Sequence, residues 1–513
     1  MHRKKLPIGI HDFEKLVRGN YYFVDKSLLI KELLDAGAQV TLLPRPRRFG
    51  KTLNISMLRY FFEKSEVDHR DLFNDLKIAE HPDCMAKQGH YPVIFLTFRD
   101  VKQGDWRESL PTIKELIAAE FERHRAVLEG DTLGPVQRRN FLGVLEGTAE
   151  SAIYRASLRI LSACLHKYHG VPPVILIDEY DAPIHAAFEH RYYDDAIQFM
   201  RNFLCGGLKD NDHLEFGVLT GILRIAKESI FSGLNNLEVD TFVQRPYADK
   251  FGLLEDEVAA LLAYFDFPEP ISAVRDWYDG YRGGPWRLYN PWSIVNLAKY
   301  GTLQPYWINT SDNALLKAVL QHGPDELKTD LIRLLQGEAV TQEIDVSTVL
   351  TDLMTHVSAA WNLLLMSGYV TFENLRPDPT LEGSEIAELR IPNTEVRWVY
   401  QRQILSWFAG AQVKQQYRSM LESLVAGDRE SFRELFEELV EQALSIFDVT
   451  GKNPEKFYHG LVLGMLASLQ ATHEVISNRE SGLGRYDVSI FPKDVHQLGI
   501  IMEFKVVKKK RGE

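Results

Sequence analysis

The stretch TLLPRPRRFGKTLNISML, at residues 41–58, constrains the fold more than any other part of the chain. An apolar run at 40–43 leads through a turn ending in Gly50, Lys51 and Thr52 to a segment of helical periodicity. A strand, a tight turn and a helix N-terminus in this order make a phosphate-binding loop, because backbone N–H groups and the helix dipole attract an anion. Gly50 would permit close backbone approach, Lys51 would reach the phosphates, and the Thr52 hydroxyl would ligate Mg²⁺.

The entrance to this loop is basic. Arg45 stands where the general pattern has its first glycine, and GKT alone is a weak signal, so a basic loop that contains these letters by chance stays open. Pro44 and Pro46 stiffen the loop by fixing φ. Arg45, Arg47 and Arg48 either neutralise triphosphate charge or point outward at a nucleic-acid backbone, and the sequence does not choose between these roles.

A second apolar run, 174–177, leads directly into carboxylates. Asp178 would hold Mg²⁺ through water, and Glu179 would orient and deprotonate the water that attacks the γ-phosphate. A carboxylate at this place also suits a turn that merely ends a strand. The loop at Gly50–Thr52 upstream favours the nucleotide interpretation.

A third run, 216–219, ends in Thr220, which could sense the γ-phosphate. Arg224, or else Lys227, would supply positive charge to the transition state. Ordinary charges on a helix surface explain these two cations equally well.

The pattern of apolar runs predicts the fold class. Unbroken runs at 40–43, 93–98, 174–177 and 216–219, separated by helical segments, are typical of an α/β domain with a parallel sheet. We expect four segments along the chain: an α/β domain at 1–238, a helical lid or linker at 239–345, a winged-helix-like and helical region at 346–447, and a small α/β domain at 448–513.

Composition narrows the functional class. The chain has 513 residues, a net charge of -12 and three cysteines, Cys84, Cys164 and Cys205, with no C-x-x-C pair. The negative charge argues against a protein that coats nucleic acid over its whole surface. The cysteines argue against a disulfide framework or a cysteine-ligated zinc site. With no signal-peptide pattern and no apolar run that would cross a bilayer, we expect a cytoplasmic protein without a membrane partner.

The C-terminal segment carries a further acidic pattern. Residues 486–491 and 500–506 suggest two strands, which would bring Asp487, Glu503 and Lys505 together. Asp487 and Glu503 would bind a metal, and Lys505 would be catalytic in phosphodiester hydrolysis. The same spacing also fits an ordinary half-exposed edge strand.

Two other segments can each be interpreted in two ways. The aromatic residues between 277 and 292 would form either a stacking platform for bases or, as we favour, a packed aromatic core. The winged-helix-like region has an acidic local sequence, so contact with protein is at least as well supported as contact with DNA.

The motifs RPRRFGKT, LIDEYDAP, TGILRIAKESIFSGLNNL, LYNPWSIVN and LLLMSGYVTF…IPNTEV together resemble the bacterial AAA-ATPase-like family. The resemblance spans nearly the whole chain, and members commonly carry a C-terminal nuclease-like domain of the PD-(D/E)XK type. It implies a three-layer P-loop NTPase with an additional strand, and in this family the RPRRFGK loop is the usual form. It also implies ATP and Mg²⁺ as cofactors. The residues expected to bind nucleotide are Arg48, Phe49, Gly50, Lys51, Thr52, Asp178 and Thr220, with Glu179 and Arg224 catalytic.

The resemblance predicts an ATP hydrolase coupled to a nuclease-like module, with DNA and further copies of the chain as candidate partners. The chain stops eight residues after Lys505, so we expect a truncated domain with a parallel or mixed sheet left uncovered on one face. Two alternatives stay open: a nucleotide-dependent switch, or a DNA-binding protein with an inactive nuclease remnant.

Overall fold

The structure is a computed structural model that describes residues 3–223, 236–307, 325–335, 337–345, 356–407, 411–446, 466, 469, 472–481, 484–494 and 496–503. The chain divides into two compact units. The first comprises Met1–Trp307 and Ile344–Tyr369, and the second comprises Ile308–Glu343 and Val370–Glu513. The division into four segments stays a prediction.

The first unit is built on a five-stranded parallel sheet with the order β2-β3-β4-β1-β5. Its strands are β1 Val40–Pro44, β2 Val93–Thr97, β3 Val174–Asp178, β4 Phe216–Gly221 and β5 Leu237–Val239. All four predicted runs are strands, and β1 and β3 are buried along their whole length, as continuous apolar character indicates. Because β4 lies between β1 and β3, the sheet has the additional-strand order that the resemblance implied.

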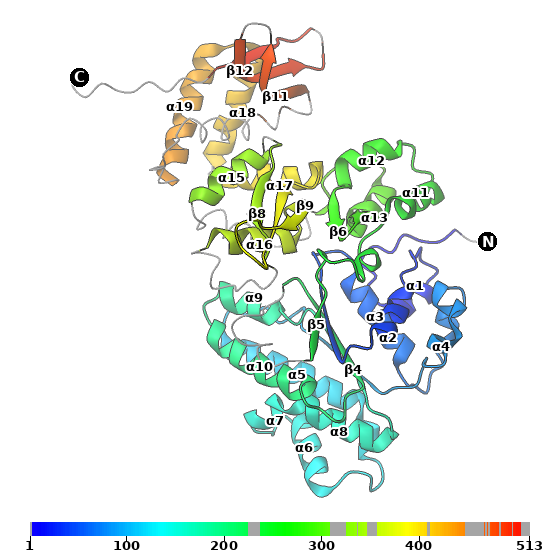
Figure 1. The fold of residues 1–513 in the computed structure, drawn as a ribbon. Helices are drawn as coiled ribbons and strands as arrows, with labels where there is room; N and C mark the ends of the chain where they lie inside the picture. Colours follow the sequence, from blue (N-terminus) through cyan, green and yellow to red (C-terminus); the bar gives the residue numbers. More distant parts are fainter. Residues whose placement is uncertain are drawn as a thin grey trace. The chain divides into compact units, whose positions relative to one another are not determined.

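Helices cover both faces of this sheet. Phe216 of β4 contacts Phe62 of α3, whereas its neighbour Gly217 lies against Leu208 of α10, so the two helices pack on opposite faces. Figure 1 shows α1 to α4 in blue on one side and α5 to α10 in cyan and green on the other. The three-layer α/β prediction is therefore confirmed.

The helices of this domain are α1 Phe13–Arg18, α2 Leu28–Ala36, α3 Lys51–Phe62, α4 Pro82–Met85, α5 Trp106–Arg123, α6 Pro135–Leu145, α7 Ser151–Arg155, α8 Ser157–His169, α9 Ala182–Glu189 and α10 Tyr193–Leu208. Short 3-10 turns are η1 Arg70–Phe73, η2 Lys77–Glu80, η3 Arg125–Leu128 and η4 Ala248–Lys250. None of the helices among the described residues is both long and apolar enough to cross a membrane.

The rest of the first unit is mainly helical. It comprises α11 Glu255–Tyr264, α12 Ile271–Tyr278, the hairpin β6 Tyr281–Gly283 with β7 Trp286–Leu288, α13 Pro291–Tyr300 and α16 Val357–Ser367. Tyr278 and Tyr289 are fully buried in a cluster with Leu261 and Leu297, and Trp277 and Trp292 pack against it. The aromatic patch is thus largely a packed core, as favoured from the sequence, although Trp286 is exposed.

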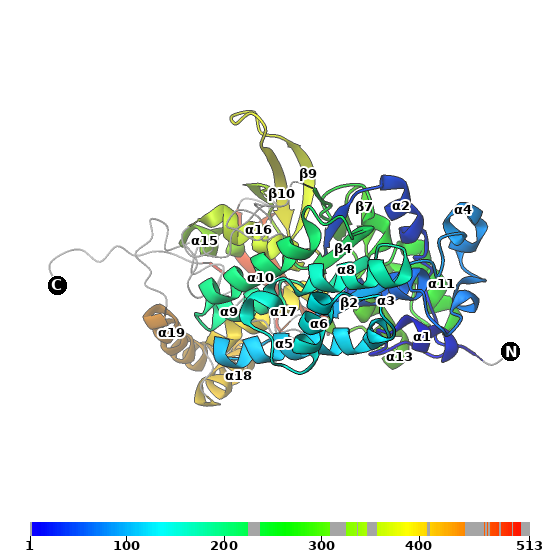
Figure 2. The same cartoon turned by 90° about the horizontal axis from the view of Figure 1, so that it is seen from below.

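The second unit contains two antiparallel three-stranded sheets. The first has the order β8-β10-β9, built from β8 Val340–Glu343, β9 Thr371–Pro377 and β10 Glu385–Arg390. Figure 2 shows β9 and β10 side by side as a hairpin. In the sequence α16 precedes them, so this stretch of the predicted winged-helix-like region runs helix, strand, loop and strand. The helices of this unit are α15 Asp325–Leu335, α17 Thr394–Trp407, α18 Ala411–Ala426 and α19 Arg429–Ile446.

The second sheet lies near the C-terminus and has the order β11-β12-β13, from β11 His473–Ser481, β12 Gly484–Pro492 and β13 Ile500–Met502. Both pairings are antiparallel, so the prediction of a parallel or mixed sheet is wrong for the described strands. Val488 and Ile490 are fully buried in a cluster with Leu424 of α18 and Leu439 of α19. The two helices therefore cover one face of this sheet.

Candidate nucleotide-binding site

The loop between β1 and α3 has the geometry of an anion site. Gly50 is the N-cap of α3 and has a φ of 87°, a left-handed conformation that glycine adopts without strain. A Cβ placed on Gly50 would meet no atom within 4 Å, so open space lies beside the loop. No side chain caps the first turn of α3, which leaves its backbone N–H groups for a ligand.

Lys51 lies inside this loop and is only 5% exposed. Its Nζ donates hydrogen bonds to the carbonyl oxygens of Arg45 and Pro46, each at 3.0 Å. Burial lowers the pKa of the ammonium, although the carboxylates of Glu179 and Asp178 oppose this effect. The ammonium is thus held by loop carbonyls and faces two predicted site acids.

Asp178 joins three strand ends at the carboxyl edge of the sheet. One carboxylate oxygen, Oδ2, accepts a hydrogen bond from Thr52 Oγ1 at 2.8 Å, and Oδ1 accepts one from Thr220 Oγ1 at 2.8 Å. Asp178 is fully buried. The structure therefore brings together Thr52 after β1, Asp178 at the end of β3 and Thr220 in β4, as their places at strand ends predicted.

Glu179 follows Asp178 in an unusual backbone conformation. Its φ is 49°, which is uncommon for a residue with a side chain and occurs preferentially at functional sites. Burial raises the pKa of its carboxyl, Lys51 opposes the rise, and Asp178 and Asp181 add to it. A carboxyl with a raised pKa beside a lysine suits a general base that works near neutral pH.

Comparison with known proteins agrees with this geometry. Residues 7–231 match the model of the family described as Predicted AAA-ATPase. This part of the chain is therefore similar to the AAA-ATPase-like family. Residues 453–513 match the model of the PD-(D/E)XK nuclease superfamily. The whole chain is also similar to an uncharacterized protein in the vnfD 5' region of Azotobacter chroococcum mcd 1, with 28% identity covering 99% of this chain and 90% of the relative.

Two further residues hold the end of β4 in place in the AAA-ATPase-like domain. Neither was singled out from the sequence. Asp181 Oδ2 accepts hydrogen bonds from the backbone N–H groups of Ile222 at 2.8 Å and Leu223 at 2.9 Å, and from His185 Nε2 at 3.1 Å. The Tyr180 hydroxyl donates a hydrogen bond to the Leu223 carbonyl at 2.6 Å.

The pKa of Asp181 reflects these contacts. Burial acts to raise it, but the hydrogen bonds from His185, Leu223 and Ile222 outweigh burial and hold it below its usual value. The sequence signal was a second aspartate three residues after Asp178 in the run DEYD. Its partners lie about forty positions away, so local pattern did not reveal the role.

The arginines of the AAA-ATPase-like loop have different environments. Arg45 is 1% exposed and forms an ion pair with Asp240, whose carboxylate oxygen lies 2.6 Å from the guanidinium. Because this side chain is buried and paired with Asp240, it does not point outward at nucleic acid, and it would have to leave this partner to bind phosphate. Arg48 is exposed, has a φ of 68°, and lies over the Trp292 ring at 4.6 Å from its centroid.

Phe49 packs inside the domain. Its ring lies edge-on to Tyr281 at 5.1 Å, and its carbonyl accepts a hydrogen bond from the Gly252 N–H. Only the backbone N–H of Phe49 is therefore left for a nucleotide. Arg224, the predicted catalytic cation, lies outside the described residues.

The C-terminal candidates are only partly described. Asp487 is a position in β12, Glu503 directly follows β13 and is exposed, and Lys505 lies outside the described residues. The register pairs Val488 with Met502, so its continuation by one residue sets position 487 opposite position 503. The predicted adjacency of the two strands is confirmed, while the metal-binding roles stay predictions.

The metal preference of the candidate sites follows from their donor groups. Within the described part of the chain, no group of three or more histidine, cysteine or acidic side chains is arranged for a metal ion. At the AAA-ATPase-like site the donors are instead the Thr52 hydroxyl and the Asp178 carboxylate, which touch each other. Oxygen donors of this kind, few in number, fit Mg²⁺, which keeps several waters and uses phosphate oxygens as well.

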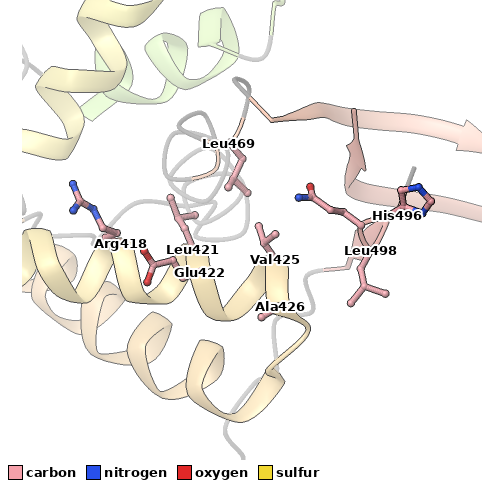
Figure 3. Close-up of a pocket in the computed structure, with 9 residues that line it drawn as sticks. Arg418, Leu421, Glu422, Val425, Ala426, Leu469, His496 and Leu498 are labelled. Carbon is pink, nitrogen blue, oxygen red and sulfur yellow. The ribbon is translucent and has the colours of Figure 1, made fainter. Parts of the chain in front are cut away.

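A groove in the second unit is lined by none of these candidate residues. It is lined by apolar side chains of α18 and by Leu469 and Leu498, with Arg418, Glu422 and His496 among them (Figure 3). Neither Asp487 nor Glu503 lines it. The groove therefore belongs to neither predicted reaction centre.

Proposed function

We propose that this chain is a Mg²⁺-dependent ATPase whose AAA-ATPase-like domain is coupled to a nuclease-like module that acts on nucleic acid. The observation that carries the proposal is the convergence of Lys51, Thr52, Asp178 and Glu179 at the carboxyl edge of one parallel sheet. Ligands in open α/β sheets bind at this edge, outside the ends of the strands.

The loop residues bind and orient the triphosphate. The free N–H groups at the start of α3 and the space beside Gly50 accommodate phosphate oxygens. Lys51 exchanges its bonds to the Arg45 and Pro46 carbonyls for bonds to the β- and γ-phosphates. The ammonium is hydrogen-bonded in both states, so little desolvation opposes binding.

The acids prepare the attacking water. Glu179 takes a proton from the water that attacks the γ-phosphorus, while Thr220 fixes the orientation of the Asp178 carboxylate. Thr52 and Asp178 would hold Mg²⁺, which neutralises charge on the phosphate oxygens when bound. Arg224 is the proposed source of further positive charge.

ATP binding by the purified chain tests the proposal. We expect the parent to bind and hydrolyse ATP with Mg²⁺, and Lys51→Ala to bind ATP about 10- to 100-fold more weakly, because charged hydrogen bonds to phosphate are lost. Equilibrium titration with a fluorescent ATP analogue measures the change. Lys64→Ala, an exposed lysine beyond the end of α3, is the matched control and should bind like the parent. Equal affinity in parent and Lys51→Ala would remove the loop from nucleotide binding.

For the nuclease-like module we propose that Asp487 and Glu503 hold a divalent metal and that Lys505 activates water or stabilises the phosphorane. The parent should cut supercoiled plasmid in Mg²⁺, and Asp487→Asn, Glu503→Gln and Lys505→Ala should each abolish cutting. Asp494→Asn, an exposed acid between β12 and β13, should cut normally. If the parent cuts plasmid with none of the divalent metals tested, the module is an inactive nuclease remnant. Steeply salt-dependent DNA binding would then favour a DNA-binding role.

Measuring ATP consumption with and without DNA tests the proposed coupling. We expect DNA to change the rate of hydrolysis, because the two domains are parts of one chain. Binding of ATP without turnover, with or without DNA, would favour the nucleotide-dependent switch instead. A cytoplasmic location and self-association are further parts of the proposal.

A further inference from the structure

We propose that Arg45 and Asp240 form an internal latch that positions the phosphate loop, and through it Lys51, for nucleotide. Asp240, directly after β5, is then a positioning residue for a site that it does not touch. The inference rests on the proposed nucleotide-binding function and adds to it the reason why an arginine stands at the place of the loop glycine.

The latch is a bonded pair enclosed in the domain. The guanidinium donates to the Asp240 carboxylate at 2.6 Å, to the Asp240 backbone carbonyl at 2.6 Å and to the Pro44 carbonyl at 2.9 Å. It also lies over the Phe251 ring, with 4.9 Å to the centroid. Asp240 is 3% exposed. A planar guanidinium can meet several acceptors at once in a fixed fork, which a lysine cannot do.

The backbone of Arg45 links the latch to the site. Its N–H donates to the Gly221 carbonyl at 3.0 Å, next to the Thr220 that contacts Asp178. Its carbonyl accepts a hydrogen bond from Lys51 Nζ at 3.0 Å. The residue held by Asp240 is therefore the same residue that holds the ammonium, so the latch sets the place from which Lys51 meets the phosphates.

Direct phosphate binding by Arg45 is the competing role, and Asp240→Asn separates it from the latch. Without a charged partner, Arg45 holds the loop less well. We therefore expect the affinity for ATP to fall about tenfold, as for the loss of one charged hydrogen bond. If Arg45 instead binds phosphate, loss of its partner frees the guanidinium and affinity stays the same or rises. Either of those results would overturn the latch.

Arg45→Met is the second variant, because Asp240→Asn leaves a buried guanidinium that cannot lose its proton and risks unfolding the domain. Burial raises the pKa of Asp240 to about 6 although Arg45 opposes the rise, so a carboxyl left without Arg45 can become neutral. We expect Arg45→Met to fold better than Asp240→Asn and to lose affinity to a similar degree. In steady-state hydrolysis the loss should appear in KM, with kcat changed less than about threefold.

A matched control separates positioning from general destabilisation. Arg123 forms an ion pair with buried Glu120 at 2.5 Å and contacts the carbonyl of Val93, at the start of β2 and hence at the opposite end of the sheet. Arg123→Met should lower the melting temperature but bind ATP like the parent. An equal loss of ATP affinity in Arg123→Met and Arg45→Met would show that destabilisation alone explains the effect, and would overturn the latch.

Hydrogen exchange without nucleotide tests the latch even if ATP binding fails. Loop amides at 47–50 should exchange faster in Arg45→Met than in the parent, and at the parental rate in Arg123→Met. If the parent does not bind ATP but these amides still exchange faster in Arg45→Met than in the parent, the proposed function is refuted and the latch is retained. Unchanged exchange in Arg45→Met would refute the latch, whatever the protein binds.

Discussion

Glu179→Gln should lower the rate of ATP hydrolysis by about 10²- to 10⁴-fold while leaving ATP affinity close to that of the parent. The amide has nearly the shape of the carboxyl but cannot accept the proton of the attacking water. Because Lys51, Thr52 and Asp178 are unchanged, the predicted phosphate contacts stay in place. Phosphate release in single-turnover conditions, together with equilibrium ATP titration, measures both quantities.

The pH dependence of the parental kcat gives a second test of Glu179 as the base. Burial raises the pKa of Glu179 above its usual value, and a base acts only when it is deprotonated. The parental kcat should therefore fall on the acid side at a higher pH than an exposed glutamate would give. Glu189→Gln, which changes an exposed residue at the end of α9, should keep the parental rate and profile. Parental turnover in Glu179→Gln would exclude Glu179 as the base.

Asp181→Ala should lower the free energy of unfolding by about 2–5 kcal/mol, because two buried backbone N–H groups and His185 lose their acceptor. The alanine cannot bond Ile222 or Leu223, and water has little access to a carboxylate that is 1% exposed. Urea unfolding measures the total loss. Hydrogen exchange at the amides of Ile222 and Leu223 should accelerate and so localise the effect.

The stability difference between parent and Asp181→Ala should depend on pH. The folded-state pKa of Asp181 is lowered, so its contribution is present above the unfolded-state value, about 3.9, and is lost as pH falls through the lower folded value. The two proteins should therefore converge in stability below about pH 4. Asp195→Ala, which removes an exposed acid from the first turn of α10, should cost under about 1 kcal/mol. Equal costs for the two variants would contradict the role of Asp181 at the end of β4.

The sequence alone predicted the carboxyl edge of the sheet well. Apolar runs of four residues identified β1, β3 and β4, and residues that end or follow these strands, Lys51, Asp178 and Thr220, gather at one edge. The reason is geometric: parallel strands end on the same side, so residues that follow them in sequence become neighbours in space. At the C-terminus two strands were predicted correctly, but their direction was not, because a short strand pattern carries no information about its partner.

Sequence order by itself thus determined which strands carry the predicted site, since the ends of buried parallel strands meet whatever the loops between them do. Only the tertiary structure decided what the individual charges do. Arg45 belongs to a basic loop in the sequence, yet it is buried because Asp240, 195 positions away, supplies a partner. Asp181 looks like a further site acid, yet it bonds the backbone after β4. A charged side chain has the same local sequence whether it faces a ligand or a buried partner, and its role depends on which distant segment packs against it.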